Sequence, residues 1–267
     1  MPRKPMTVAV LCSGRAPGLL HALSRDGGRD RAYQIVCCVS SDTAFVALAQ
    51  VERCGVPTSA HPIRRFYEER GASIYGDPAV RAEYDAQMAE LLMPYAPDLV
   101  LLDGYLYLIT APLLTAFPGR ILNLHFSDLT LRRPDGRPRF PGIRAVHDTL
   151  AAGLPETYAT MHLVNAEPDD GAPILRSWPF PVSPMVTDAL AWKATNLFRA
   201  YAYAHQEWMI GAAAGPMLVA ALELVAAGVV DLTRLAAAEP HTVAPWQLDE
   251  CGHVTSPMPE GNSVAVR

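Results

Sequence analysis

The chain has 267 residues, of which 50% are apolar and 18% are charged, so the composition excludes a disordered or coiled-coil protein and suits a large α/β domain. A net charge of -5 argues against a general nucleic-acid-binding surface, which needs an excess of Lys and Arg. The five cysteines form no C-x-x-C pair, and we expect free thiols in a cytoplasmic protein. The N-terminus carries no apolar signal segment. The most hydrophobic stretch, Trp208–Val230, contains Pro216 and Glu223, which favours a buried helical hairpin over a membrane span.

The first half of the chain alternates between short apolar runs and amphipathic segments. The apolar runs predict four strands: Thr7–Leu11, Ile35–Val39, Leu99–Leu102 and Ile121–Leu124. The intervening segments predict three helices: Leu19–Arg25, Thr43–Cys54 and Pro78–Tyr95. Strands that alternate with helices indicate parallel crossovers and a doubly wound sheet. The neighbours Cys37 and Cys38 should point to opposite faces of their strand.

The second half predicts a different arrangement. Two strand-like runs, Thr157–Val164 and Ile174–Val182, flank a polar turn and indicate an antiparallel extension of the sheet. A helical region follows from Thr187 to about Gly228. We therefore expect an α/β fold with a Rossmann-like, mostly parallel twisted sheet and helices on both faces. Its main, catalytic domain should span residues 1–230, and residues 231–267 should form a C-terminal extension with a small hairpin at 245–254 and a loose last ten residues.

Asn123 and His125 are the first candidate functional pair. They lie two positions apart at the end of a predicted strand, so both side chains share one face. Ligands of open α/β sheets bind beyond the carboxyl ends of the strands. An amide can donate to a developing oxyanion and an imidazole can exchange protons near neutral pH, which favours acyl transfer. Asn and His at a strand end are also often simple turn residues, as is Asp169 in Asp169-Asp170-Gly171.

Taken in order, several segments resemble one family of enzymes. Residues 98–109 and 119–125, followed by Met161–Val164 and by Asp169-x-Gly171, resemble glycinamide ribonucleotide formyltransferase, a folate-dependent formyltransferase. The resemblance extends diffusely from Thr7 to Trp208. It implies transfer of a formyl group from 10-formyltetrahydrofolate to the amine of a small molecule.

The resemblance also implies roles for particular residues. Asn123, His125 and Asp169 match the catalytic residues, and Asp169 also contacts the folate. The loop at 106–109 matches the one that holds the folate, with backbone contacts expected at Leu108 and Ile109 and with Tyr107 where close relatives carry Arg. No H-E-x-x-H motif and no clustered His and Cys spacing in this chain indicates a metal site. His147 and His162 are interpreted as packing or surface residues.

Two segments depart from the family and concern the acceptor. The family's first loop is a small Gly-Asn-Gly-Ser-type sequence that cradles a phosphate, whereas this chain has Ser13-Gly14-Arg15 followed by Pro17, which removes a backbone donor. We expect Ser13, Gly14 and Arg15 to bind the acceptor, since Arg15 supplies charge and a helix N-terminus favours an anion. An insertion at 130–139 carries four arginines, which either clamp an anionic group or form a solvated loop.

The acceptor implied is glycinamide ribonucleotide or a specialised, phosphorylated or anionic metabolite, and homodimer formation stays open. Three other functions are alternatives to formyl transfer to a small-molecule amine. Water in place of the amine would make the protein a 10-formyltetrahydrofolate hydrolase, although such deformylases carry an additional N-terminal domain. A methionyl-tRNA formyltransferase would need an RNA-binding domain that this acidic chain does not offer. A non-catalytic folate-binding protein would not require all three of Asn123, His125 and Asp169.

Overall fold

Five parallel strands form one half of a twisted sheet. The computed structural model describes residues 4–24, 32–43, 47–74 and 76–257. These residues form a nine-stranded sheet in the order β11-β10-β8-β7-β5-β4-β1-β2-β3. The parallel strands are β1 (Met6–Cys12), β2 (Tyr33–Ser40), β3 (Thr58–Ala60), β4 (Leu99–Leu102) and β5 (Ile121–His125). Their carboxyl ends therefore meet at one edge of the sheet, where ligands of such folds bind.

The other half of the sheet begins antiparallel to β5. Strand β7 (Thr160–Leu163) is antiparallel to β5 and to β8 (Pro173–Arg176). Strand β10 (Trp246–Leu248) runs parallel to β8 and forms a hairpin with β11 (Val254–Thr255). The predicted fold class is thus confirmed. The C-terminal hairpin adds two strands to the same sheet, and the last ten residues, predicted to be loose, lie outside the described residues.

The two predicted strands of the second half are each divided in two. Besides β7 and β8, these runs contain the short strands β6 (Glu156–Thr157) and β9 (Phe180–Pro181), which pair with each other in a separate two-stranded ribbon. Prolines at 179 and 181 lack the N–H that a continuous ladder needs, which accounts for the division of the longer run.

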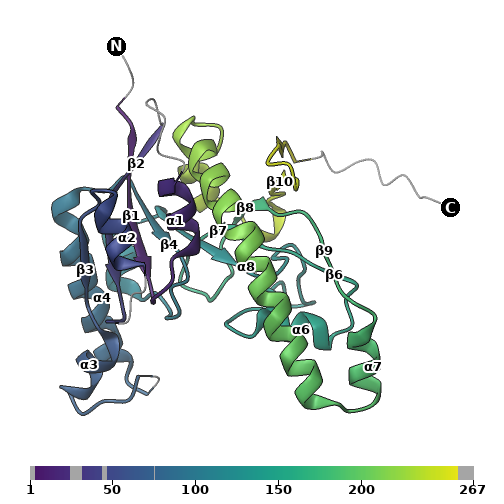
Figure 1. Cartoon of the computed structure of the whole chain (residues 1–267). Coiled ribbons are helices and arrows are strands. Elements are labelled where there is room, and N and C mark those ends of the chain that lie inside the picture. The colour runs from purple at the N-terminus through teal and green to yellow at the C-terminus, as the bar shows by residue number, and fades with distance from the viewer. Residues whose placement is uncertain (1–3, 25–31, 44–46, 75, 258–267) are drawn as a thin grey trace.

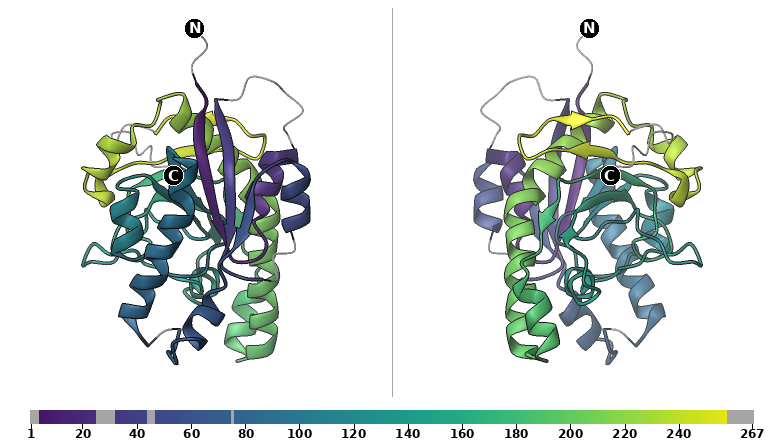
Figure 2. Two further views of the ribbon diagram at one scale, coloured as in Figure 1. Left: turned by 90° about the vertical axis from the view of Figure 1, so that its left-hand side faces the viewer. Right: turned by 90° about the vertical axis from the view of Figure 1, so that its right-hand side faces the viewer.

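Helices cover both faces of the sheet (Figures 1 and 2). One face carries helices α1 (Pro17–Ser24), α2 (Leu48–Arg53), α6 (Ala145–Ala151), α7 (Met185–Ala191) and α8 (Thr195–Ala226). The other carries α3 (Ile63–Glu68), α4 (Pro78–Leu92) with a 3-10 turn at Met93–Tyr95, and α5 (Ala111–Ala116). Helix α9 (Leu232–Ala236) and a 3-10 turn at Pro240–Thr242 lead to the hairpin.

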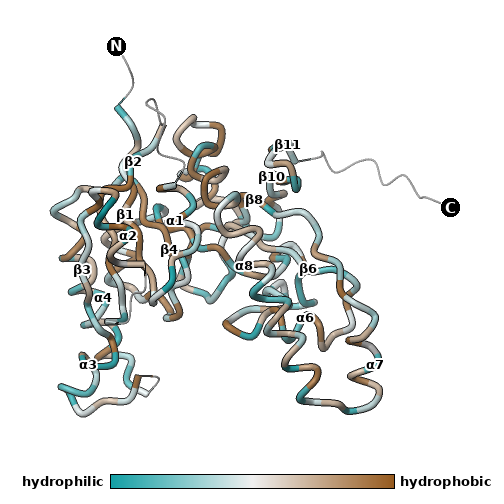
Figure 3. Tube along the Cα trace, viewed as in Figure 1, coloured by the Kyte–Doolittle hydropathy of each residue, from teal (hydrophilic) through white to brown (hydrophobic). Residues whose placement is uncertain are grey.

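The alternation of side chains along the strands builds two cores. In β1, Val8 and Val10 pack toward α1 and α8, whereas Ala9 and Leu11 pack toward α3 and α4. Cys37 and Cys38 join opposite cores, as the alternation predicted. The hydropathy-coloured trace shows apolar residues concentrated in these central strands (Figure 3). The sheet is therefore covered on both faces, as mostly parallel sheets generally are.

Helix α8 corrects one prediction. The expected helical hairpin around Pro216 is wrong, because residues 195–226 form a single 32-residue helix that contains this proline. The helix packs closely on α1: a side chain at Gly215 would place its Cβ 2.3 Å from the ring of His21. By length and composition α8 could cross a membrane, but 61% of its most apolar window is buried inside the fold, as in the core helix of a soluble protein.

Candidate active site

A cavity of about 560 Å³ lies at the carboxyl edge of β1, β4 and β5. Its walls come from the loop after β4 (102–111), the end of β5 (123–126), residues 142–146, the β7–β8 region (162–169) and one side of α8. This volume falls in the range of small-molecule sites, roughly 300–1,000 Å³. The topology thus places the chemistry-bearing segments of the sequence around one hollow.

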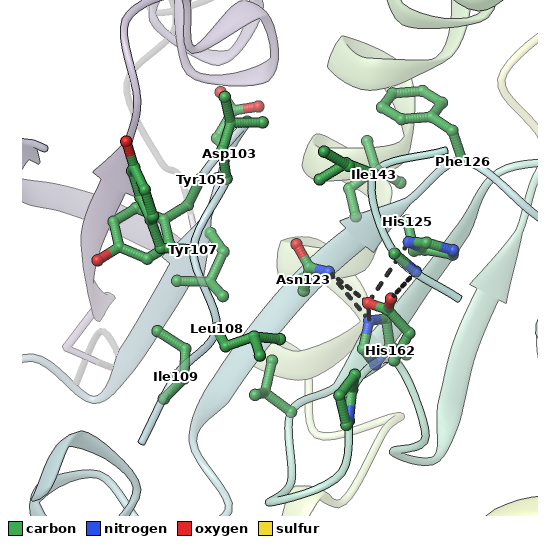
Figure 4. Close-up of a pocket in the computed structure, with 18 of the residues that line it drawn as sticks. Asp103, Tyr105, Tyr107, Leu108, Ile109, Asn123, His125, Phe126, Ile143 and His162 are labelled. Atoms are coloured by element: carbon green, nitrogen blue, oxygen red, sulfur yellow. Dashed lines mark hydrogen bonds and ion pairs between the residues drawn. The ribbon is translucent and has the colours of Figure 1, made fainter. Parts of the chain in front are cut away.

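Asn123, His125 and Asp169 come together on one wall of this cavity. Strand β5 presents the first two, and the loop between β7 and β8 presents Asp169. The Asp169 Oδ1 atom lies 3.4 Å from Asn123 Nδ2 and 3.4 Å from His125 Nδ1. The side chains of Asn123 and His125 point toward the same polar cluster (Figure 4). One carboxylate oxygen of Asp169 therefore contacts two side chains that precede it by 44 and 46 positions in the sequence.

The Asp-x-Gly segment has a steric basis. Gly171 packs so tightly against the end of β7 that a Cβ atom there would lie 1.6 Å from the carbonyl oxygen of Leu163. Asp169 itself adopts a left-handed backbone conformation, with φ of 53°, and its Oδ2 accepts a hydrogen bond of 2.7 Å from the Gly142 N–H. Only glycine allows this close approach, and the resulting turn aims the carboxylate at β5.

His162 is a site residue that the sequence analysis missed. It was interpreted as a packing or surface residue, but β7 pairs it directly with Asn123. Its Nδ1 donates to the Leu163 carbonyl at 2.9 Å, so its Nε2 is free to accept from Asn123 Nδ2 at 3.1 Å and lies 3.7 Å from Asp169 Oδ1. A single histidine in an apolar strand was the available signal, but its register against β5 was unknown.

The protonation of the site follows from burial and hydrogen bonding. Burial alone would raise the pKa of Asp169, but the neighbouring imidazoles of His162 and His125 and the Gly142 N–H together hold that pKa well below its usual value. Burial lowers the pKa of His125, and the charge of Asp169 opposes this effect. His125 Nε2 donates to the Phe140 carbonyl at 3.0 Å, so a second proton on this ring faces Asp169. The site can therefore stabilise an imidazolium formed during a reaction.

The loop after β4 forms a second wall and is held from behind. Arg81 of α4 donates to the Leu108 carbonyl from Nε at 2.9 Å and from Nη2 at 2.7 Å, and it pairs with Asp85 at 2.7 Å. Asp85 in turn accepts from the Thr110 N–H at 2.7 Å. Tyr107, Leu108 and Ile109 all line the cavity. Since the Leu108 carbonyl already accepts two hydrogen bonds, a ligand would contact this residue through its N–H or its side chain.

The loop between β1 and α1 carries an arginine that is paired with a glutamate. Arg15, whose side chain is exposed, forms two hydrogen bonds to the half-buried Glu207 of α8, at 2.7 and 2.8 Å. Ser13 Oγ lies 2.7 Å from Ser41 Oγ and accepts from the Leu106 N–H at 3.1 Å. Ser13 and Arg15 line the cavity, whereas Gly14 is not among the described residues that do so. Glu207 had no role in the sequence-based prediction.

The arginine-rich insertion folds back on itself. A bridge pairs Arg132 with Pro138, and Arg132 forms an ion pair with Asp170, the neighbour of Asp169. Of the residues that the structure describes, no arginine of 130–139 lines the cavity. The described part of the chain also holds one exposed group with metal-ligand atoms, Asp249, Cys251 and His253, in the turn between β10 and β11 and outside the cavity lining.

These features define a class of protein: a Rossmann-like α/β fold that carries an amide, an imidazole and a carboxylate at the carboxyl edge of its sheet. Residues 6–195 match the family described as formyl transferase. Because this match covers well over half of the chain, the protein belongs to the formyl transferase family.

Curated relatives agree with this assignment. Phosphoribosylglycinamide formyltransferase of Haemophilus influenzae is 26% identical over 170 residues, which cover 64% of this chain and 71% of that protein. The trifunctional purine biosynthetic protein adenosine-3 of Drosophila melanogaster is 27% identical over 172 residues, which cover 64% of this chain but 11% of that protein. The chain thus spans only a small part of the trifunctional relatives.

Solved structures show the same fold. Glycinamide ribonucleotide transformylase 1 from Symbiobacterium toebii is 30% identical, with a TM-score of 0.58 over 84% of this chain and 89% of that one. A formyltetrahydrofolate deformylase from Pseudomonas syringae is 19% identical, with a TM-score of 0.61 over 85% of this chain and 63% of that one. The second likeness concerns the fold alone.

Proposed function

We propose that this protein transfers a formyl group from 10-formyltetrahydrofolate to the primary amine of a small-molecule acceptor. One observation carries the proposal: Asn123 and His125 both lie 3.4 Å from the same oxygen of Asp169, on the wall of a cavity large enough for a small-molecule ligand. Membership of the formyl transferase family supports the choice of the formyl group. The five free thiols support a reducing, cytoplasmic location.

The chemistry requires one new bond, one broken bond and one relocated proton. 10-Formyltetrahydrofolate supplies the formyl carbon. The acceptor nitrogen forms a C–N bond to this carbon, and the bond from the carbon to the folate nitrogen breaks. The attacking amine loses a proton and the departing folate nitrogen gains one. Asp169 and His125 lie where they can carry this proton between the two nitrogens, directly or through water.

Asn123 and His125 stabilise the oxygen that becomes negative. Asn123 has one strong hydrogen bond, to His162 at 3.1 Å, and one weak contact, to Asp169 at 3.4 Å. The amide hydrogen of the weak contact turns to the formyl oxygen without loss of the stronger bond. Protonated His125 donates from Nδ1 to the same formyl oxygen, and contacts of 3.4 Å are long enough to shorten in the reactive complex.

A turnover assay tests the function. The protein is incubated with 10-formyltetrahydrofolate and a panel of primary amines, and the absorbance of released tetrahydrofolate is followed. We expect release that depends on an amine and yields the N-formyl product. Release at the same rate without any amine would instead identify a hydrolase. Binding of the folate without turnover across the panel would identify a binding protein.

A further inference from the structure

The carboxylate of Asp103 lies at the N-terminus of α1. Asp103 directly follows β4, and its Oδ2 accepts a hydrogen bond of 2.7 Å from the Leu19 N–H. The Gly18 N–H also favours the charged form of this carboxylate and lowers its pKa. The side chain is only 3% exposed, and burial raises its pKa to about 6, against the opposing effect of the two N–H donors. The carboxylate is therefore predominantly ionised at neutral pH.

This contact uses the donors that a helix offers to an anion. Pro17, the first residue of α1, has no N–H, the Leu19 N–H binds Asp103, and the Gly18 N–H between them stabilises the same charge. The Leu20 N–H continues the helix by donating to Ala16. The geometry is also tight, since a Cβ at Gly18 would lie 3.2 Å from Asp103 Oδ1 and 2.6 Å from Leu218. An internal carboxylate thus fills the position where helix N-termini of other proteins hold a phosphate.

The charges around the cavity also disfavour a phosphate. Among the described residues that line it, Arg15 is the one Arg or Lys, and both of its outer nitrogens bind Glu207. The acidic lining residues are Asp103, Glu167 and Asp169. A phosphate dianion near α1 would meet a buried negative charge and an arginine that is already neutralised, whereas a protonated amine would be attracted to such a lining.

We propose that the formyl acceptor of this protein is a primary amine that carries no phosphate group. The inference deepens the proposed function and rests on it. Relatives whose names specify a phosphoribosyl compound need an anion site, and in this chain Asp103 occupies the candidate for that site. The sequence analysis expected the N-terminus of α1 to bind an anion of the acceptor, whereas in the structure the carboxylate of Asp103 occupies this position.

A matched pair of acceptors tests the substrate class. The wild-type protein with 10-formyltetrahydrofolate is given glycinamide ribonucleotide and, separately, the same compound without its phosphate. We expect kcat/KM for the phosphate-free compound to be at least tenfold higher. A kcat/KM for the phosphorylated compound that equals or exceeds the other overturns the proposal.

A binding measurement tests the same inference without turnover. Inorganic phosphate is titrated into the protein to 10 mM, and the amide resonances of residues 14–19 are followed by NMR. We expect no saturable shift of these amides. Saturable binding there below 10 mM overturns the proposal even if neither acceptor is formylated. Failure of the proposed function would appear differently, as absence of 10-formyltetrahydrofolate binding in a parallel titration.

Variants identify the group responsible. Asp103→Ala frees the N–H groups of Gly18 and Leu19, and we expect at least a tenfold gain in phosphate affinity. Asp98→Ala, at the exposed opposite end of β4, makes the same change in charge and should give no gain. Asp103→Asn preserves the volume and removes the charge, so it should show a smaller gain and serves if Asp103→Ala does not fold. A folded Asp103 variant without any gain overturns the assignment.

Discussion

Replacing Asp169 with Asn removes the charge of this side chain and keeps its shape, so the variant measures what the charge contributes to activity. The amide keeps an oxygen for the Gly142 N–H but leaves His125 without its anionic partner. At the observed 3.4 Å, two unit charges attract by about 5 kcal/mol if the effective dielectric constant is about 20, which indicates the size of the expected loss. Loss of a general acid–base group typically lowers the rate roughly 100- to 10,000-fold, or about 2.7 to 5.4 kcal/mol, which is similar in size to this attraction.

The assay is the steady-state release of tetrahydrofolate as a function of pH. We expect kcat of Asp169→Asn to fall about 100- to 10,000-fold at pH 7. Burial already lowers the pKa of His125 and Asp169 raises it, so the variant should lose protonated His125 at a lower pH than the wild type. The fall of activity with rising pH should shift to lower pH accordingly. A kcat within tenfold of wild type, with an unchanged pH profile, would refute the role of this pair.

Three further predictions follow from the same geometry. Asn123→Ala should lower kcat about 100- to 1,000-fold, as loss of an oxyanion donor does, with thermal unfolding close to that of wild type; normal turnover would contradict the donor role. Gly171→Ala should destabilise the fold by about 3 kcal/mol or more in urea unfolding, because its Cβ would lie 1.6 Å from the Leu163 carbonyl oxygen. The control Gly211→Ala lies in α8, where a Cβ would meet nothing within 4 Å, and it should stabilise the fold by about 0.5–1 kcal/mol. The lowered pKa of Asp169 means that its charge stabilises the fold fully above its unfolded pKa of about 3.9, and that this contribution is lost as the pH falls from there toward the lower pKa of the folded protein. The difference in unfolding free energy between wild type and Asp169→Asn should therefore shrink from pH 7 to pH 3. A constant difference would show that the charge is not responsible.

Four of the five parallel strands were predictable because their apolar runs are short and bounded, whereas the three-residue β3 has no such run and was missed. The positions of Asn123 and His125 on one face follow from the alternation along β5 alone. Asp169 could be joined to them only through the family resemblance, because nothing local connects residues 44 positions apart. His162 was out of reach because it depends on the register between β5 and β7.

Long-range contacts also underlie the other differences between the sequence-based predictions and the structure. Pro216 suggests a break when it is considered alone, but α8 continues through it as one helix that packs tightly against His21 at Gly215. The anion at the start of α1 comes from Asp103, 84 positions beyond its partner Leu19. A local sequence can therefore indicate that a helix N-terminus favours negative charge, but not which molecule provides it.

The C-terminal hairpin protects the protein against aggregation. Strand β10 lies along β8, through the pairs Trp246–Leu175 and Gln247–Arg176, and the Arg176 Nε donates to Gln247 Oε1 at 3.0 Å. Without this cover, β8 would present unpaired backbone groups to solvent, and exposed sheet edges recruit strands from neighbouring molecules. A protein shortened before residue 240 should therefore self-associate into β-rich aggregates, with its catalytic residues still in place.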